Sequence, residues 1–69
     1  MNTEQIKTEL KNGVTFEFSN EEDIFEIQFS KRFNKFMVTQ NGSVIKSTKS
    51  FNFLDKIISD NNLTLSDNN

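Results

Sequence analysis

The sequence contains no cysteine, histidine, tyrosine or tryptophan, and it has only two glycines. Without cysteine there is no disulfide bond, and without cysteine and histidine a structural zinc site is excluded. The same absences remove the commonest general acid–base groups of enzymes and the cysteine nucleophile. The two glycines, Gly13 and Gly42, are too far apart to form a glycine-rich phosphate-binding loop. We therefore predict a protein that is not an enzyme and that uses no cofactor and no metal.

Long apolar runs are also missing. No segment approaches the ~18 apolar residues that a membrane-spanning helix requires, and the first residues lack the apolar stretch of a signal peptide. The absence of cysteine fits a reducing compartment. The composition therefore predicts a soluble, cytoplasmic protein with no membrane contact.

With 69 residues, the chain is long enough for one small domain, which we expect over residues 1–65, with 66–69 as a flexible C-terminal end. Chains of this size gain only about 3–5 kcal/mol from their core. The apolar residues here are mostly large, with eight Phe, six Ile and four Leu, and there is no Ala. Such side chains favour a sheet packed on a helix, because each contributes about 1.5–3 kcal/mol when buried. Self-association or a permanent partner would add further stability.

The segment 36–48 predicts the central hairpin of the fold. Asn41 and Gly42 stand between two β-prone runs, which is typical of a type I′ turn, because both residues of that turn need a positive φ. The expected cross-strand pairs are Gln40–Ser43, Thr39–Val44, Val38–Ile45 and Phe36–Ser47. Ile45 is then expected on the buried face of the sheet.

Two further strands precede this hairpin. The segments 14–19 and 24–30 alternate apolar and polar residues, and the polar residues 20–23 form the turn between them. The residues expected to point inward are Val14, Phe16, Phe18, Phe25, Ile27 and Phe29. The segment 30–35 contains the next chain reversal, and the pattern leaves open whether Phe33 ends a strand or packs under the turn.

A short helix is predicted at the start of the chain. Asn2 and Gln5 have the spacing of a capping box, and Gly13 stands where a helix ends. Ile6 and Leu10 give this helix a narrow apolar stripe.

A second helix is predicted over residues 51–60. Ser50 or Asn52 is its expected N-cap, and the segment Asp60–Asn62 is expected to end it, because asparagine is the usual substitute for glycine at a left-handed C-cap. The apolar stripe consists of Phe53, Leu54, Ile57 and Ile58, Phe51 closes the edge of the same core, and Leu63 and Leu65 are expected to fold back.

The resulting fold class is α+β, with the order α-β-β-β-β-α. We expect a four-stranded antiparallel meander sheet packed on the C-terminal helix, with a short N-terminal helix. The C-terminal helix should cover the sheet face that carries Phe16, Phe18, Phe25, Ile27, Phe29, Phe36, Val38 and Ile45.

The opposite face of the predicted sheet is mostly polar but carries an apolar patch formed by Ile24, Met37 and Val44. The sequence leaves open what covers this apolar patch: the N-terminal helix, a second copy of the chain, or a partner protein. The free edges of the sheet offer a further binding mode, the addition of a strand.

Charge is unevenly distributed along the chain. Residues 1–26 hold seven acidic and two basic residues, whereas residues 27–54 hold five basic residues and no acidic one. The acidic turn consists of Glu21, Glu22 and Asp23. The basic pole consists of Lys31, Arg32, Lys35, Lys46 and Lys49. A meander places the acidic turn at one end of the sheet and Lys31, Arg32, Lys35 and Lys49 at the other. The acidic turn lacks the spaced ligands of a calcium loop, which favours a solvated turn.

Asn, Lys, Ile and Phe supply 31 of the 69 residues, and their codons are AT-rich. In size, in this composition and in its lack of catalytic residues, the chain resembles the small accessory proteins of phages and mobile elements. Many of these, anti-CRISPR proteins among them, act by binding a host or defence protein. We therefore expect a non-enzymatic protein that inhibits a larger host or defence protein by stoichiometric binding.

Two alternatives remain open. The basic pole, with Phe33 nearby, predicts binding to single-stranded nucleic acid. The apolar patch also suits a structural or regulatory homodimer. If the chain instead inhibits a host or defence protein, the expected apolar anchors are Ile24, Met37 and Val44. The basic pole or the acidic turn then steers the encounter with that partner.

Overall fold

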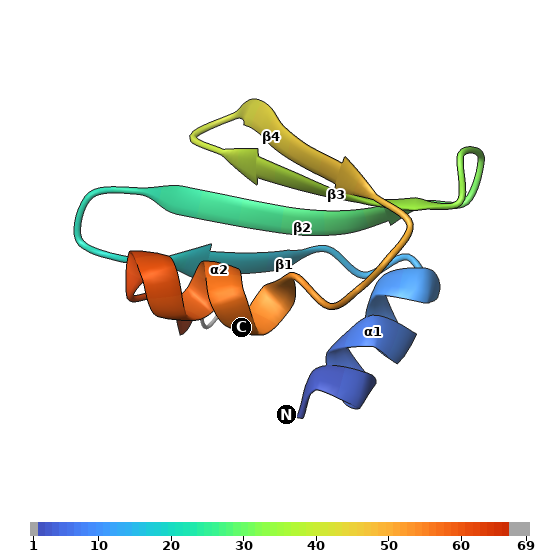
Figure 1. The fold of residues 1–69 in the computed structure, drawn as a ribbon, viewed down its shortest axis with the longest axis horizontal. Coiled ribbons are helices and arrows are strands. Elements are labelled where there is room, and N and C mark those ends of the chain that lie inside the picture. Colours follow the sequence, from blue (N-terminus) through green and yellow to red (C-terminus); the bar gives the residue numbers. More distant parts are fainter. Residues whose placement is uncertain (1, 67–69) are drawn as a thin grey trace.

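Residues 2–66, which the computed structural model describes, form two helices and one antiparallel sheet (Figure 1). In chain order the elements are α1 (Thr3–Lys11), β1 (Phe16–Ser19), β2 (Ile24–Ser30), β3 (Lys35–Gln40), β4 (Ser43–Thr48), α2 (Leu54–Asn61) and β5 (Thr64–Leu65). The strand order is β4-β3-β2-β1-β5. The four longer strands therefore form the predicted meander, and β5 adds a short fifth strand. Neither helix in the described part of the chain is long and apolar enough to cross a membrane.

The boundaries of α1 follow directly from the sequence. The side chain of Asn2 accepts a hydrogen bond from the Gln5 backbone N–H at 2.9 Å, and the Gln5 side chain accepts one from the Asn2 N–H at 2.9 Å. The helix ends at Lys11, and Gly13, the residue after the C-cap Asn12, has a φ of 98°. The N–H of Val14 donates to the carbonyl of Glu9 at 3.0 Å, as in a Schellman motif. The predicted capping box and helix end are confirmed.

Strand β1 begins at Phe16 rather than at residue 14. Val14, expected to point inward, is 39% exposed. The cause is the end of α1, because the N–H of Val14 is used to satisfy a helix carbonyl instead of joining the sheet. The prediction of a buried Val14 is wrong.

Helix α2 begins three residues later than expected. Neither Ser50 nor Asn52 caps it, and the N-cap is Phe53, which makes no side-chain cap hydrogen bond. The rings of Phe51 and Phe53 lie 4.8 and 6.3 Å from the ring of Phe36. Aromatic packing therefore holds residues 51–53 in a turn and delays the first helical residue to Leu54.

The C-terminal end of α2 agrees with the prediction and leads into β5. Asn62 is left-handed, with φ 54° and ψ 49°, and the N–H of Leu63 donates to the carbonyl of Ile58 at 3.0 Å. Leu63 is buried, and Leu65 pairs with Phe18 of β1. Both leucines therefore fold back.

The N–H of Ser66 donates to the carbonyl of Glu17 at 2.8 Å. Ser66 is the first residue of the end that we expected to be flexible, and this bond attaches it to the sheet. Residues 67–69 lie outside the described part.

The central hairpin has the predicted turn but not the predicted register. Asn41 and Gly42 have φ values of 52° and 89°, and the pairs Gln40–Ser43 and Thr39–Val44 form as expected. The register then shifts between Val38 and Thr39. The remaining pairs are Val38–Lys46, Met37–Ser47 and Phe36–Thr48.

This shift is a β-bulge that makes Ile45 the extra residue of β4. Ile45 is 49% exposed, so its predicted place in the core is wrong, as are the predicted pairs Val38–Ile45 and Phe36–Ser47. Lys46 now stands opposite the buried Val38. A long charged side chain there can extend past the edge of the sheet into water.

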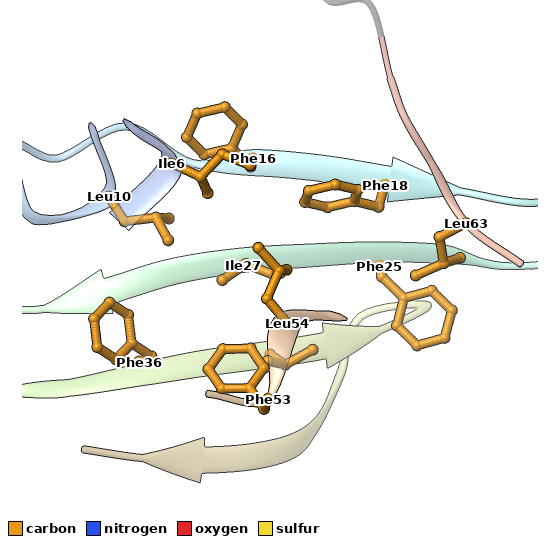
Figure 2. Close-up of a cluster of buried hydrophobic side chains, with 11 residues drawn as sticks. Ile6, Leu10, Phe16, Phe18, Phe25, Ile27, Phe36, Phe53, Leu54 and Leu63 are labelled. Atoms are coloured by element: carbon orange, nitrogen blue, oxygen red, sulfur yellow. The ribbon is translucent and has the colours of Figure 1, made fainter. Parts of the chain in front are cut away.

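The core lies on one face of the sheet and receives both helices (Figures 1 and 2). Its buried residues are Ile6, Leu10, Phe16, Phe18, Phe25, Ile27, Phe36, Val38, Phe53, Leu54 and Leu63. Phe29, Phe51, Ile57 and Ile58 are partly buried and pack against them. Helix α1 therefore contributes to the same core as α2 and does not cover the opposite face, which settles one of the alternatives left open by the sequence.

We predict that Phe36→Ala unfolds or nearly unfolds the domain, whereas Phe33→Ala leaves its stability unchanged. Phe36 is 2% exposed and its ring lies within 6.3 Å of three other phenylalanine rings. Removing such a ring costs about 3–5 kcal/mol, as much as the whole core of a small domain supplies. Phe33 is 62% exposed, and its removal should change the free energy of unfolding by less than about 0.5 kcal/mol. Urea denaturation followed by circular dichroism measures both variants, and equal effects would contradict the core described above.

Candidate functional site

The face of the sheet that points away from both helices is called here the outer face. The apolar patch predicted from the sequence lies on it, with Ile24 51% and Val44 57% exposed and Met37 half-buried. Ile45, displaced from the core by the bulge, lies beside Val44 on the edge strand. The bulge therefore enlarges the exposed apolar surface at this corner of the sheet.

A row of paired residues crosses the outer face from β1 to β4. Glu17 pairs with Glu26, Glu26 with Thr39, and Thr39 with Val44. In the next row, Gln28, Met37 and Ser47 are paired in the same way. Directly paired residues in a sheet share a face. The outer face therefore combines two carboxylates, small polar groups and exposed apolar side chains.

Glu17 and Glu26 form a like-charged cross-strand pair. Glu26 is exposed and Glu17 is half-buried. Within residues 2–66 the one ion pair joins Lys56 to Asp60, at 3.0 Å, so no basic side chain of the described chain neutralises either glutamate. Like charges directly opposite each other on paired strands are mildly destabilising. This pair makes the centre of the outer face acidic.

Strand β4 forms one edge of the sheet, and residues 43–47 are all exposed. Its outward backbone groups could pair with another strand. The bulge and Lys46 both oppose such pairing, because a bulge distorts the edge and a lysine charge disfavours a neighbouring strand. The outer face is therefore a better binding surface than the edge itself.

The acidic turn is held by hydrogen bonds within the protein. Asn20 accepts bonds from the N–H groups of Glu22 and Asp23 at 2.8 and 2.7 Å, and donates to the carbonyl of Asn61 at 2.8 Å. Asp23 accepts a bond from the Asn41 side chain at 2.8 Å, which joins the two turns at this end of the sheet. Together with Asp60, the acidic turn lines an open hollow.

No cluster of potential metal ligands is found at this hollow or elsewhere among residues 2–66. The acidic turn is joined to the C-terminal end of α2 through Asn20.

The opposite end of the sheet is basic. Lys31 and Arg32 lie in the turn between β2 and β3, Lys35 begins β3, and Lys49 follows β4. Lys46 belonged to the predicted basic pole, but it lies in the middle of β4, opposite Val38. The structure therefore brings together four of the five residues of the basic pole.

One further basic residue was missed. The ammonium of Lys11, at the end of α1, lies 5.7 Å from the centre of the Phe29 ring, near the point where β2 enters the turn 31–34. In the sequence Lys11 belongs to the acidic first part of the chain. The i, i+4 stripe of Ile6 and Leu10 shows which side of α1 is buried, but it carries no information on where the end of α1 docks. Lys11, Lys31, Arg32, Lys35 and Lys49 together are called here the basic end.

Phe33 is the most exposed large apolar residue in the described part of the chain, at 62%. It neither ends a strand nor packs under the turn, the two positions considered from the sequence. The guanidinium carbon of Arg32 lies 5.4 Å from the centre of its ring.

We predict that Glu26→Gln and Glu17→Gln each raise the free energy of unfolding by about 0.2–1 kcal/mol at low salt, because each removes the same cross-strand repulsion. The double variant should gain little more than either single one. High salt should abolish the gain, because it screens exposed charges. Chemical denaturation at two salt concentrations measures this, and additive gains that persist at high salt would contradict a repulsive pair.

The geometry therefore offers two distinct surfaces, the outer face and the basic end. Comparisons of the chain with protein-family models, with curated proteins and with solved structures find no match.

Proposed function

We propose that this chain is a non-enzymatic binding protein that docks on a larger protein through the outer face of its sheet. The observation that carries the proposal is the position of the helices. Because α1 and α2 both pack on the same face, the outer face has no cover from the described residues and leaves Ile24 and Val44 about half exposed.

The composition of the outer face supports a protein partner. Protein interfaces combine apolar anchors with polar surroundings, and a few well-placed anchors supply most of the binding energy. Here Met37 of β3 and Val44 of the edge strand β4 are the main anchors, and Ile24 lies at the start of the middle strand β2. Gln28, Thr39 and Ser47 surround Met37 and Val44. The unneutralised pair Glu17–Glu26 favours a partner surface that presents a lysine or arginine at this position.

The proposed effect on the partner is inhibition by occlusion. The chain offers no histidine, cysteine or tyrosine for catalysis, so its action on a larger protein would be stoichiometric. The molecule measures 32 by 24 by 21 Å, so one whole face is about as large as the ~800 Å² that each partner of a standard interface buries. An intracellular host or defence protein targeted by a phage or mobile element is the partner that the size and AT-biased composition favour.

We predict that Val44→Glu preserves the fold and weakens partner binding at least tenfold, the effect expected when a buried charge replaces an apolar anchor. Val14→Glu is the matched control, because it makes the same substitution at an exposed valine outside the outer face. The partner is first captured with the tagged protein from a low-GC bacterial lysate treated with nuclease. Its affinity for the three proteins is then measured by calorimetry, and circular dichroism verifies that each variant is folded.

A single stoichiometric partner that binds wild type and Val14→Glu but not Val44→Glu would support the proposal. If Val44→Glu and Met37→Glu both fold and bind with unchanged affinity, the assignment of the anchors is wrong. The solution mass of the isolated chain, 8.0 kDa as a monomer, shows whether the outer face binds a second copy of the chain or is left for a partner protein. A dimer that dissociates in Val44→Glu would assign the outer face to self-association instead.

A further inference from the structure

We propose that the basic end is a second binding site, which holds a single-stranded nucleic acid with one base stacked on Phe33. The proposal concerns a surface separate from the outer-face anchors and does not depend on the function proposed above. It rests on three observations about this end of the sheet: an exposed aromatic ring, a convergence of basic side chains, and the absence of internal partners for their charges.

Phe33 is held out of the core by the conformation of its turn. The N–H of Phe33 donates to the hydroxyl of Ser30 at 3.3 Å, and Asn34 has a φ of 53°, which turns the chain back into β3. Asparagine tolerates this left-handed conformation better than most residues. The ring is therefore presented to solvent by a defined turn.

The ring is also placed beside a positive charge. The guanidinium carbon of Arg32 lies 5.4 Å from the centre of the ring, within the range of a cation–π interaction. With this contact in place the ring is still 62% exposed. Proteins that bind single strands use the same combination, in which an aromatic ring stacks on a base and neighbouring basic groups contact the phosphates.

Basic residues reach this end from three separate parts of the chain. Lys11 comes from α1, Lys31, Arg32 and Lys35 come from the turn and the start of β3, and Lys49 follows β4. Phe36 of β3 pairs with Thr48 of β4, so Lys35 and Lys49, the next residues outward, lie at adjacent strand ends.

None of these five side chains is neutralised by a carboxylate in the described chain. The one ion pair within residues 2–66 is Lys56–Asp60, and the basic end contributes nothing to it. Although the net charge of the chain is −2, this end is therefore positive while the acidic turn lies at the opposite end (Figure 1). A polyanion would be attracted to one end only, in a defined orientation.

The combination favours a nucleic acid over other anionic partners. A lipid surface is bound by basic residues together with several inserting apolar side chains, whereas Phe33 is the one apolar residue between Ser30 and Lys35. An acidic protein surface would use the positive charges but gives the exposed ring no specific role. A single strand uses both, because its bases offer flat faces and its phosphates repeat along the chain.

The binding test uses short labelled oligothymidylate and oligouridylate, followed by fluorescence anisotropy with the full chain. With about three phosphates contacted, affinity should fall about twentyfold when the salt concentration rises fourfold, because single-strand binding follows a slope of about −0.7 per phosphate. Binding of either oligonucleotide supports the proposal. No binding at low salt, or equally tight binding to a duplex of the same length, overturns it.

The role of the ring is tested by Phe33→Ala and Phe33→Trp. Phe33→Ala should weaken binding at least about fivefold, the effect of losing one stacked base, and Phe33→Trp should retain it. Because the chain has no other tryptophan, the fluorescence of Phe33→Trp reports directly on this position. It should be quenched by oligothymidylate and not by polyphosphate, which carries the charge without bases. Equal affinity of wild type and Phe33→Ala, with equal binding of polyphosphate, overturns the proposal in favour of unspecific polyanion binding.

The role of the charges is tested by the double variant Lys31→Gln/Lys35→Gln. Its salt slope should be less steep by about 1.4, or about 0.7 for each phosphate that is no longer neutralised. Lys56→Gln is the matched control, because it also replaces a lysine by glutamine, but at the surface ion pair with Asp60. The salt slope of this variant should equal that of wild type. An unchanged slope in the double variant overturns the assignment. Val44→Glu should bind oligonucleotide like wild type, so failure here is distinguishable from failure of the outer-face proposal.

Discussion

The whole structure depends on the burial of one face of one small sheet. The chain has no disulfide or zinc site to stabilise it, so the large apolar side chains must form a single core of sufficient size. The eleven buried residues come from both helices, from β1, β2 and β3, and from the segments that precede and follow α2. Dividing these side chains between the two faces would leave two cores, each too small to stabilise the domain. Both helices therefore lie on the same face, and the outer face is exposed as a direct consequence.

Local signals in the sequence were sufficient to predict most of the fold. The capping box at Asn2 and Gln5, the left-handed Asn62 and the turn at Asn41 and Gly42 depend on neighbouring residues only, and each was predicted correctly. The alternation of apolar and polar residues in β2 and β3 showed which of their side chains face the core, and the sequential order of the strands led to the meander. The fold class followed from these elements, as did the position of the acidic turn and of four basic residues at opposite ends of the sheet.

The features that the sequence did not reveal depend on contacts between distant segments. The bulge at Ile45 leaves no sequence signal, because the run from Val44 to Lys46 fits a regular strand equally well. The late start of α2 results from the packing of Phe51 and Phe53 against Phe36. The docking of α1 on the core face, which brings Lys11 to the basic end, depends on where space remains beside α2. These are the differences that determine which residues are available for binding, so the surfaces were less predictable than the fold.

The pairing of β5 with β1 also determines when the fold is complete. The hairpins that join β1 to β4 bring together residues close in sequence, and such local contacts form early. In contrast, Leu65 and Ser66 contact β1 across more than forty intervening residues, so this pairing carries a larger loop-closure cost. Until residues 63–66 pack, the sheet has two unpaired edges and Leu63 cannot fill its place in the core. The pairing of residues 63–66 is therefore the closing step of folding, and it protects the edge of β1 from pairing with other chains.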